Sequence, residues 1–316
     1  MSALDDPDAG ALHRFRWAWY ALLAATVVQA VGVWRWFVVL GETPLLEWLH
    51  SPPDVGGWGI AEGTAQAIQL AVGWSALAAA AWCLWRPSWA PAVLLAAVQM
   101  AIAWAMTATD EGFPVAASWL PAAARRAFPW LTHAARMAAP LAVAWLAWGG
   151  AGTAGAPCQD AAMIRNAPWG LRCAPAPRFQ AGIEQLLRWA LAITFAAHGV
   201  EALQTNPVFV DLLLDSHRRW LDIDLPEARA TELLTAIGVM DLLVAALCVS
   251  TRWRWVLWWM AAWGLITAWS RVAANGWFWW HDAVVRAPHV GVPAAIAWLA
   301  PRADTLANRV ESPADT

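Results

Sequence analysis

The sequence predicts an all-α integral membrane protein of about eight transmembrane helices. Hydrophobic residues make up 60% of the 316 positions and charged residues only 14%, whereas a typical soluble domain has about 25% charged residues. The chain has 28 Trp and one Tyr, and all of its basic residues are Arg. Trp suits the headgroup regions of a bilayer, because its ring is apolar while its N–H needs a hydrogen-bond partner. The lipid bilayer is therefore an expected partner, and the net charge of −3 disfavours nucleic-acid binding.

The predicted spans are apolar stretches near the roughly 20 residues that a helix needs to cross a bilayer. In the first half of the chain they are 17–39, 65–85, 89–107 and 130–148. In the second half they are 187–203, 233–249, 255–272 and 284–300. These spans divide the chain into an N-terminal tail, a first four-helix unit, a linker rich in Gly, Ala and Pro, a second four-helix unit and a polar C-terminal tail. Their bounds are 1–16, 17–149, 150–180, 181–301 and 302–316.

The arginines of the connecting segments predict the orientation, because cytoplasmic loops carry the positive excess. With eight spans, the basic connections all fall on one side: Arg14, Arg16, Arg86, Arg165, Arg172, Arg178, Arg252 and Arg254. The alternating connections, near 42–62 and 211–232, are acidic instead. Both termini and the linker are therefore expected in the cytoplasm.

An internal duplication relates the two predicted units. Gly73 and Cys83 match Gly238 and Cys248 at a constant offset of 165 positions. The last spans also match, since Ala144-Trp145-Leu146-Ala147 repeats as 297–300. Each unit has an even number of spans, so the two units would share one orientation. The sequence thus predicts two tandem, parallel-oriented four-helix bundles.

Two segments of the second half carry a family resemblance. Arg188 to Leu203, RWALAITFAAHGVEAL, resembles the opening helix of DoxX-like membrane proteins, which begins with an Arg and ends in a His-Gly pair. Ala236 to Thr251, AIGVMDLLVAALCVST, resembles that family's second helix, which has an acidic residue soon after a Gly. The resemblance implies a four-helix unit in the bacterial inner membrane. It also implies a redox neighbourhood, because some DoxX-like proteins are subunits of quinone-linked oxidoreductases.

Ionisable side chains inside predicted spans are candidates for function, because a charge at bilayer depth is costly unless it is paired or faces a cavity. We expect a polar cluster near the outer face of the second unit: His198, Glu201, Asp241, Arg271, His281, Arg286 and His289. His and Arg would donate hydrogen bonds to the carbonyl oxygens of a quinone headgroup or another substrate. Trp277, Trp279 and Trp280 would pack against its ring. The alternative is that these groups pair to hold helices together or extend to the lipid headgroups.

Other cofactors are less favoured by the sequence. His198 and His289 are candidates for the axial ligands of a b-type haem, but we favour quinone over haem. No metal-binding motif occurs, and no CxxCH sequence, nucleophile elbow or phosphate-binding glycine loop is present.

The leading functional prediction is an accessory or quinone-interacting subunit of a redox system, with other membrane or periplasmic redox subunits as its partners. Two alternatives remain. One is a small-molecule transporter built from two parallel repeats, which would place polar groups between the repeats. The other is a membrane enzyme that uses the outer polar cluster, although no motif assigns a reaction to it.

Overall fold

The described part of the chain in the computed structural model comprises residues 7–109, 121, 125–151 and 177–300. It is helical, and no strand occurs in these ranges. Five helical segments are long and apolar enough to cross a membrane, and these are His13–Leu40, Glu62–Trp85, Trp89–Ala108, Gln180–Leu203 and Glu227–Ser250. The fold class is thus all-helical, with the apolar helices typical of a membrane protein.

The first half begins with its longest helix, α1 (Pro7–Trp34), which continues as the π-helical turn η1 (Arg35–Leu40). The elements that follow are α2 (Pro44–His50), η2 (Pro53–Val55), α3 (Glu62–Trp85), α4 (Trp89–Ala108), α6 (Phe128–Thr132) and α7 (Ala134–Ala151). Because α1 begins at Pro7, part of the predicted N-terminal tail is helical.

The second half has its elements in the same order of long and short helices. They are α9 (Pro177–Leu203), α10 (Pro207–Leu221), α11 (Glu227–Ser250), α12 (Arg254–Asn275), η3 (Trp277–Trp279), α13 (His281–Val284) and α14 (Pro288–Leu299). The middle of the predicted linker and the predicted C-terminal tail from residue 302 lie outside the described residues.

Two of the predicted spans are not continuous helices. The predicted span 130–148 is interrupted at His133, between α6 and α7, and the predicted span 284–300 is interrupted between α13 and α14. After these breaks, the apolar helix 134–148 and the 12-residue α14 are shorter than a full membrane crossing. These two predicted spans are therefore discontinuous. The predicted span 255–272 lies within α12, which is not among the five spanning candidates.

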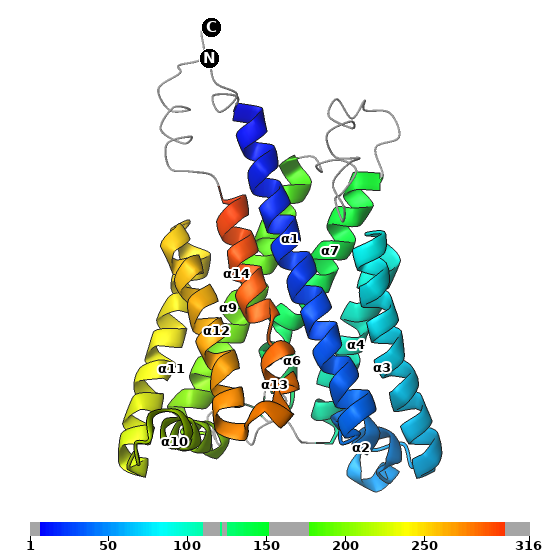
Figure 1. Cartoon of the computed structure of the whole chain (residues 1–316), viewed down its shortest axis with the longest axis vertical. Helices are drawn as coiled ribbons and strands as arrows, with labels where there is room; N and C mark the ends of the chain where they lie inside the picture. Colours follow the sequence, from blue (N-terminus) through cyan, green and yellow to red (C-terminus); the bar gives the residue numbers. More distant parts are fainter. Residues whose placement is uncertain (1–6, 110–120, 122–124, 152–176, 301–316) are drawn as a thin grey trace, which may run out of the picture.

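Two helices lie in the acidic connections, where only loops were expected. Helix α2 starts after Thr43, whose hydroxyl accepts a hydrogen bond from the Leu46 backbone N–H, and has Pro44 in its first turn. Helix α10 starts in the same way, after Asn206 and with Pro207 as its first residue. A side-chain acceptor followed by proline is a strong start signal for a helix. Figure 1 shows α10 lying across one end of the bundle.

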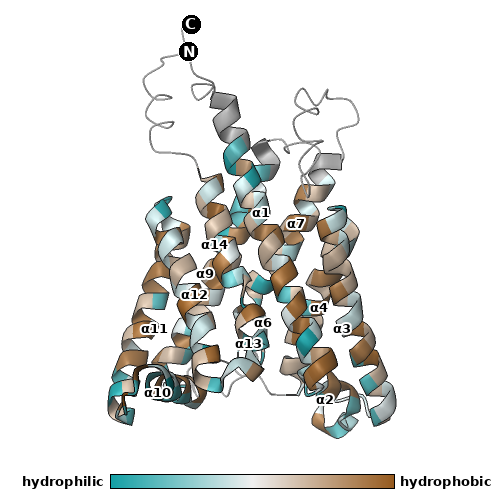
Figure 2. Cartoon of the chain, in the orientation of Figure 1, coloured by the Kyte–Doolittle hydropathy of each residue, from teal (hydrophilic) through white to brown (hydrophobic). Residues whose placement is uncertain are grey.

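Each half forms a closed ring of packed helices, α1–α3–α4–α7 and α9–α11–α12–α14. The two rings adjoin through α1 against α14 and α7 against α9, so these four helices lie in the middle and α3, α4, α11 and α12 lie outside (Figure 1). Helix α1 begins and α14 ends at the same end of the bundle (Figure 1). Hydrophobic residues cover much of the outer helices, and hydrophilic residues gather at their ends and near α6 and α13 (Figure 2).

The matching glycines Gly73 and Gly238 each allow a close helix contact. A Cβ atom at Gly238 would lie 2.8 Å from the backbone oxygen of Gly199, so α9 and α11 pack backbone to backbone. A Cβ atom at Gly73 would lie 2.8 Å from a methyl group of Val38. Small residues commonly permit such contacts between helices in membranes.

Candidate functional site

The second half encloses a cavity of about 150 Å³ between α9, α10, α11, α12 and α14. Its walls are mostly apolar, with Phe195, Phe209 and Trp263 supplying rings and Leu213 and Leu234 supplying aliphatic groups. A cavity of this volume accommodates a single six-membered ring, as an engineered apolar cavity of about 150 Å³ accommodates benzene.

The structure brings five of the seven predicted polar residues to this cavity. His198, Asp241, Arg271, Arg286 and His289 all line it. They come from α9, α11, α12, the turn after α13, and α14, so they are widely separated in sequence. The apolar walls and the polar residues together match the general composition of a small-molecule site, in which a few polar groups orient an otherwise apolar ligand.

Glu201 belongs to the same cluster through His198. The two residues lie three positions apart on α9, and Glu201 Oε2 is 2.9 Å from His198 Nδ1. Glu201 is buried, and its other oxygen has no hydrogen-bond partner. The carboxylate orients the imidazole through Nδ1, as carboxylates do for many functional histidines. The rings of His198 and His289 meet edge to face with their centroids 5.7 Å apart.

Asp241 places a carboxylate inside the bundle. The residue is 5% exposed and lines the cavity together with Trp263 of α12, and its Oδ1 has no hydrogen-bond partner. The corresponding position of the first half is Ala76, which borders a small crevice with Gln29 and Gln99 that has no room for a water molecule. The cavity is thus a property of the second half.

The remaining predicted residues lie elsewhere. His281 packs beside Trp36 and Trp279, with its Nε2 3.6 Å from an Asp282 oxygen. Trp277 is 68% exposed and contacts the Trp269 ring. The guanidinium of Arg35 lies 5.1 Å from the ring centroid of Trp280.

None of Trp277, Trp279 and Trp280 lines the cavity. The turn after α12, with Gly276 in a conformation that favours glycine, carries these rings away from it. Phe195, Phe209 and Trp263 line it instead. The sequence contains no stronger indication for these three aromatic residues than their position in apolar segments.

The cavity reaches the outer surface of the bundle. Ile266 lines the cavity and is also 55% exposed. Helices α11 and α12 touch each other much less than α3 and α4 do, and α10 packs against both of them. The cavity thus borders the outer surface of the bundle beside α12.

His133 and Arg136 of the first half are a second buried polar pair, which does not line the cavity. His133 Nδ1 lies 2.8 Å from the Pro129 carbonyl, and Arg136 donates to the other ring nitrogen at 2.9 Å. These bonds fix a neutral imidazole, since Nδ1 must carry the proton that it donates and Nε2 must accept. The sequence signal for this pair is that His133 and Arg136 lie three positions apart, as Arg286 and His289 do in the opposite order.

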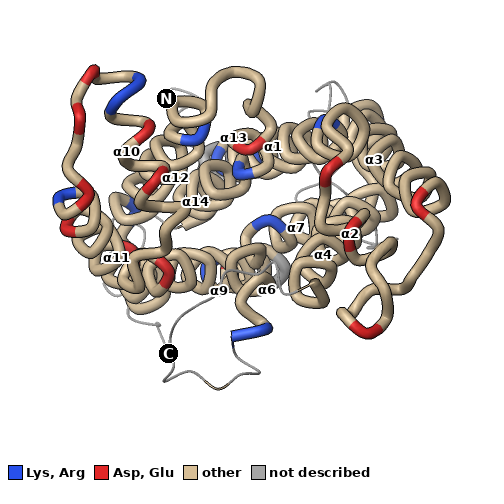
Figure 3. Tube along the Cα trace, turned by 90° about the horizontal axis from the view of Figure 1, so that it is seen from below, with Lys and Arg blue, Asp and Glu red and all other residues tan. Residues whose placement is uncertain are grey.

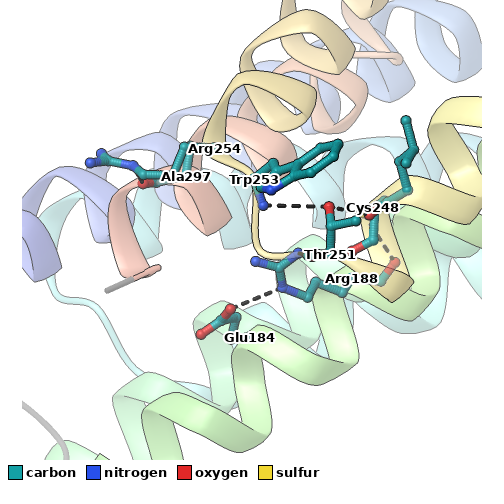
Figure 4. Close-up of polar contacts among 8 residues, drawn as sticks. Glu184, Arg188, Cys248, Thr251, Trp253, Arg254 and Ala297 are labelled. Carbon is teal, nitrogen blue, oxygen red and sulfur yellow. Dashed lines mark hydrogen bonds and ion pairs between the residues drawn. The ribbon is translucent and has the colours of Figure 1, made fainter. Parts of the chain in front are cut away.

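Arg188 has a structural role at the other end of the second half (Figure 4). It donates to Glu184 at 2.9 Å and to the backbone oxygens of Cys248 and Thr251 at 2.8 and 3.2 Å. These carbonyls end α11 and lack intrahelical partners. A cation there also interacts favourably with the helix dipole.

No group of three or more His, Cys, Asp or Glu side chains is placed to hold a metal ion in the ranges that the structure describes. Comparison with known proteins gives no match to a family model, a curated protein or a solved structure. The function of this chain is therefore inferred from its site.

Proposed function

We propose that this chain is a DoxX-like protein of the bacterial inner membrane that binds a quinone headgroup in the cavity of its second half. It would act as an accessory, quinone-interacting subunit beside other membrane or periplasmic redox subunits. The observation that carries the proposal is a ring-sized apolar cavity that opens toward the lipid-facing surface and has basic side chains on one wall.

The proposed membrane arrangement has eight transmembrane helices in two tandem, parallel four-helix units that arose by duplication. The two closed rings of helices and the repeated order of long and short elements support it. The breaks at His133 and at 285–287 make the fourth helix of each unit a two-piece span. With the basic connections inside, both termini are cytoplasmic.

The polar wall suits a quinone because a quinone presents only hydrogen-bond acceptors. Arg271 and Arg286 carry guanidinium donors, and Arg271 Nε has no partner. His289 Nε2 also has no partner. Each buried polar atom without a partner costs about 1–3 kcal/mol, so a ligand that supplies acceptors would stabilise the site. The rings of Phe195 and Phe209 would cover the faces of the headgroup.

The test is binding of a short-chain benzoquinone to the purified full-length protein in detergent micelles. Wild-type protein should bind it saturably, and His198→Ala and Phe195→Ala should each weaken binding about tenfold or more. His13→Ala is a matched control, because His13 lies in the N-terminal part of α1, does not line the cavity and has its ring beside Trp17. Unchanged affinity in both cavity variants, with normal protein yield, would refute the proposal.

A transporter is the second candidate, and the two broken helices favour it. Discontinuous helices at corresponding places in two repeats commonly mark the substrate site of a transporter. Here the breaks occur at His133 and before Pro288.

A single cysteine at Thr267, which lines the cavity, would test alternating access in a background without the native cysteines. A transporter predicts labelling by a membrane-impermeant thiol reagent from both sides of the membrane. A lipid-accessible quinone site predicts labelling from neither.

A further inference from the structure

The polar residues of the cavity come from two different pairs of packed helices. His198 and Asp241 belong to α9 and α11, which pack against each other. Arg271 belongs to α12, and Arg286 and His289 lie just before and within α14, which packs against α12. Figure 3 shows acidic positions beside α11 and basic positions near α13, in the middle of the molecule. A ligand in the cavity therefore meets different hydrogen-bonding groups from the two pairs.

The α9–α11 pair supplies hydrogen-bond acceptors. Asp241 lines the cavity, and its Oδ1 is buried without a partner among the described residues. His198 Nδ1 lies 2.9 Å from an oxygen of Glu201, so the neutral ring carries its proton on Nδ1 and has its acceptor on Nε2. In the ranges that the structure describes, no ion pair includes Asp241. Its carboxylate is thus available to a ligand.

Close helix packing brings these two acceptors to neighbouring places. Gly199 directly follows His198, and a Cβ atom on Gly199 would lie 3.2 Å from the Cβ atom of Asp241. Asp241 therefore lies against the turn of α9 that carries His198. The contact is possible because Gly199 and Gly238 let the two backbones approach closely.

The α12–α14 pair supplies hydrogen-bond donors. A guanidinium group has donors only, and Arg271 Nε has no partner in the part of the chain that the structure describes. The hydroxyl groups of Thr267 and Ser270 also line the cavity, but each donates to a carbonyl of its own helix. A quinone has acceptors only, so it would satisfy this pair and leave the acceptors of the α9–α11 pair without a donor.

We propose that the cavity binds the hydroquinone form of its ligand in preference to the quinone, with Asp241 and His198 as the acceptors. This preference rests on the proposed function and specifies which redox form the site selects. A hydroquinone hydroxyl group both donates and accepts, so one hydroxyl donates to Asp241 or to His198 Nε2 while the other accepts from the arginines. The quinone instead turns a carbonyl oxygen toward a buried carboxylate that has no donor, which is unfavourable.

The test compares the two redox forms of one short-chain benzoquinone on the purified full-length protein in detergent micelles. The hydroquinone is kept reduced under nitrogen, and the binding of each form is followed by calorimetry. The two forms share one ring and differ little in size, so the ratio of their affinities depends on hydrogen bonding rather than on packing. Wild-type protein should bind the hydroquinone about tenfold more tightly or better, as expected for a hydrogen bond to a charged acceptor.

The variant Asp241→Asn tests the acceptor directly, because the amide has nearly the volume of the carboxylate but carries donors. The affinity ratio should fall about tenfold, mainly through weaker binding of the hydroquinone. Asp215→Asn is the matched control, because Asp215 is exposed on α10 and does not line the cavity; it should keep the wild-type ratio. The ratio of the wild-type protein decides the proposal even if Asp241→Asn does not fold.

The outcomes distinguish this preference from the proposed function. Equal or tighter binding of the quinone by wild-type protein, or an unchanged ratio in folded Asp241→Asn, would overturn the preference and leave the quinone site standing. Absence of saturable binding of either form would overturn both. Binding of the hydroquinone without measurable binding of the quinone would support the preference and refute quinone binding as such.

Discussion

Replacing Arg188 by Met should remove one of the strongest links between α9 and α11. Arg188 is buried, and its guanidinium serves the carboxylate of Glu184 and two backbone carbonyls at the end of α11 (Figure 4). Met keeps most of the apolar length of the side chain but donates no hydrogen bond. The loss leaves a largely buried carboxylate and two carbonyls without their donor.

The expected loss follows from the burial of this ion pair. The side chains of Arg188 and Glu184 are 6% and 15% exposed. Removing one partner of a buried pair typically costs about 3–5 kcal/mol. The chain offers a matched control in Arg229 and Glu232 on α11, a helical pair whose side chains are 70% and 63% exposed. Exposed pairs contribute about 0–1 kcal/mol, so Arg229→Met should change stability by no more than that.

The assay is reversible unfolding in mixed micelles with a rising fraction of denaturing detergent, followed by tryptophan fluorescence and circular dichroism. Arg188→Met should lower the free energy of unfolding by about 3 kcal/mol or more. A double-mutant cycle with Glu184→Gln then isolates the pair itself from the carbonyl contacts. Equal effects of Arg188→Met and Arg229→Met would refute the reasoning, because they would show that burial does not strengthen this interaction.

Two further predictions concern the packing of the spans. Gly238→Val should destabilise the protein by about 1–3 kcal/mol, because the new Cβ would lie 2.8 Å from the backbone oxygen of Gly199. The control is Ala246→Val on the exposed side of α11, which should change the free energy of unfolding much less in the same assay. Gln69→Leu should cost about 2 kcal/mol or more, since the Gln69 amide donates to the carbonyls of Phe37 and Gly41 at 3.0 and 2.8 Å; a neutral result would show that water or another group replaces this donor.

The sequence identified the apolar spans because their length and composition are local properties. Five predicted spans coincide with helices long enough to cross a membrane. The positions of the breaks were harder to predict, because Pro129 and Pro288 are tolerated in the first turn of a helix. The helices α2 and α10 were also missed, although Thr43-Pro44 and Asn206-Pro207 mark their starts.

The candidate site was predicted in part, because the residue types that form it are also a local property of the sequence. An ionisable residue in an apolar stretch can be found from the sequence, which is how His198, Asp241, Arg271, Arg286 and His289 were chosen. Their common cavity depends on how α10, α11 and α12 pack, and no spacing along the chain specifies it. The Trp277–Trp279 turn shows why sequence proximity is not sufficient: its residues are close in sequence to the polar residues, but their rings do not line the cavity.

By itself, the sequence determined that this is a helical protein with apolar, Trp-rich segments and a small set of buried ionisable residues. Hydropathy and helical periodicity arise from neighbouring residues, so they can be read along the chain. Only the tertiary structure decided that His198, Asp241 and Arg286 line one cavity. Their common position depends on the packing of α9, α11, α12 and α14, which brings together side chains that lie far apart in the sequence.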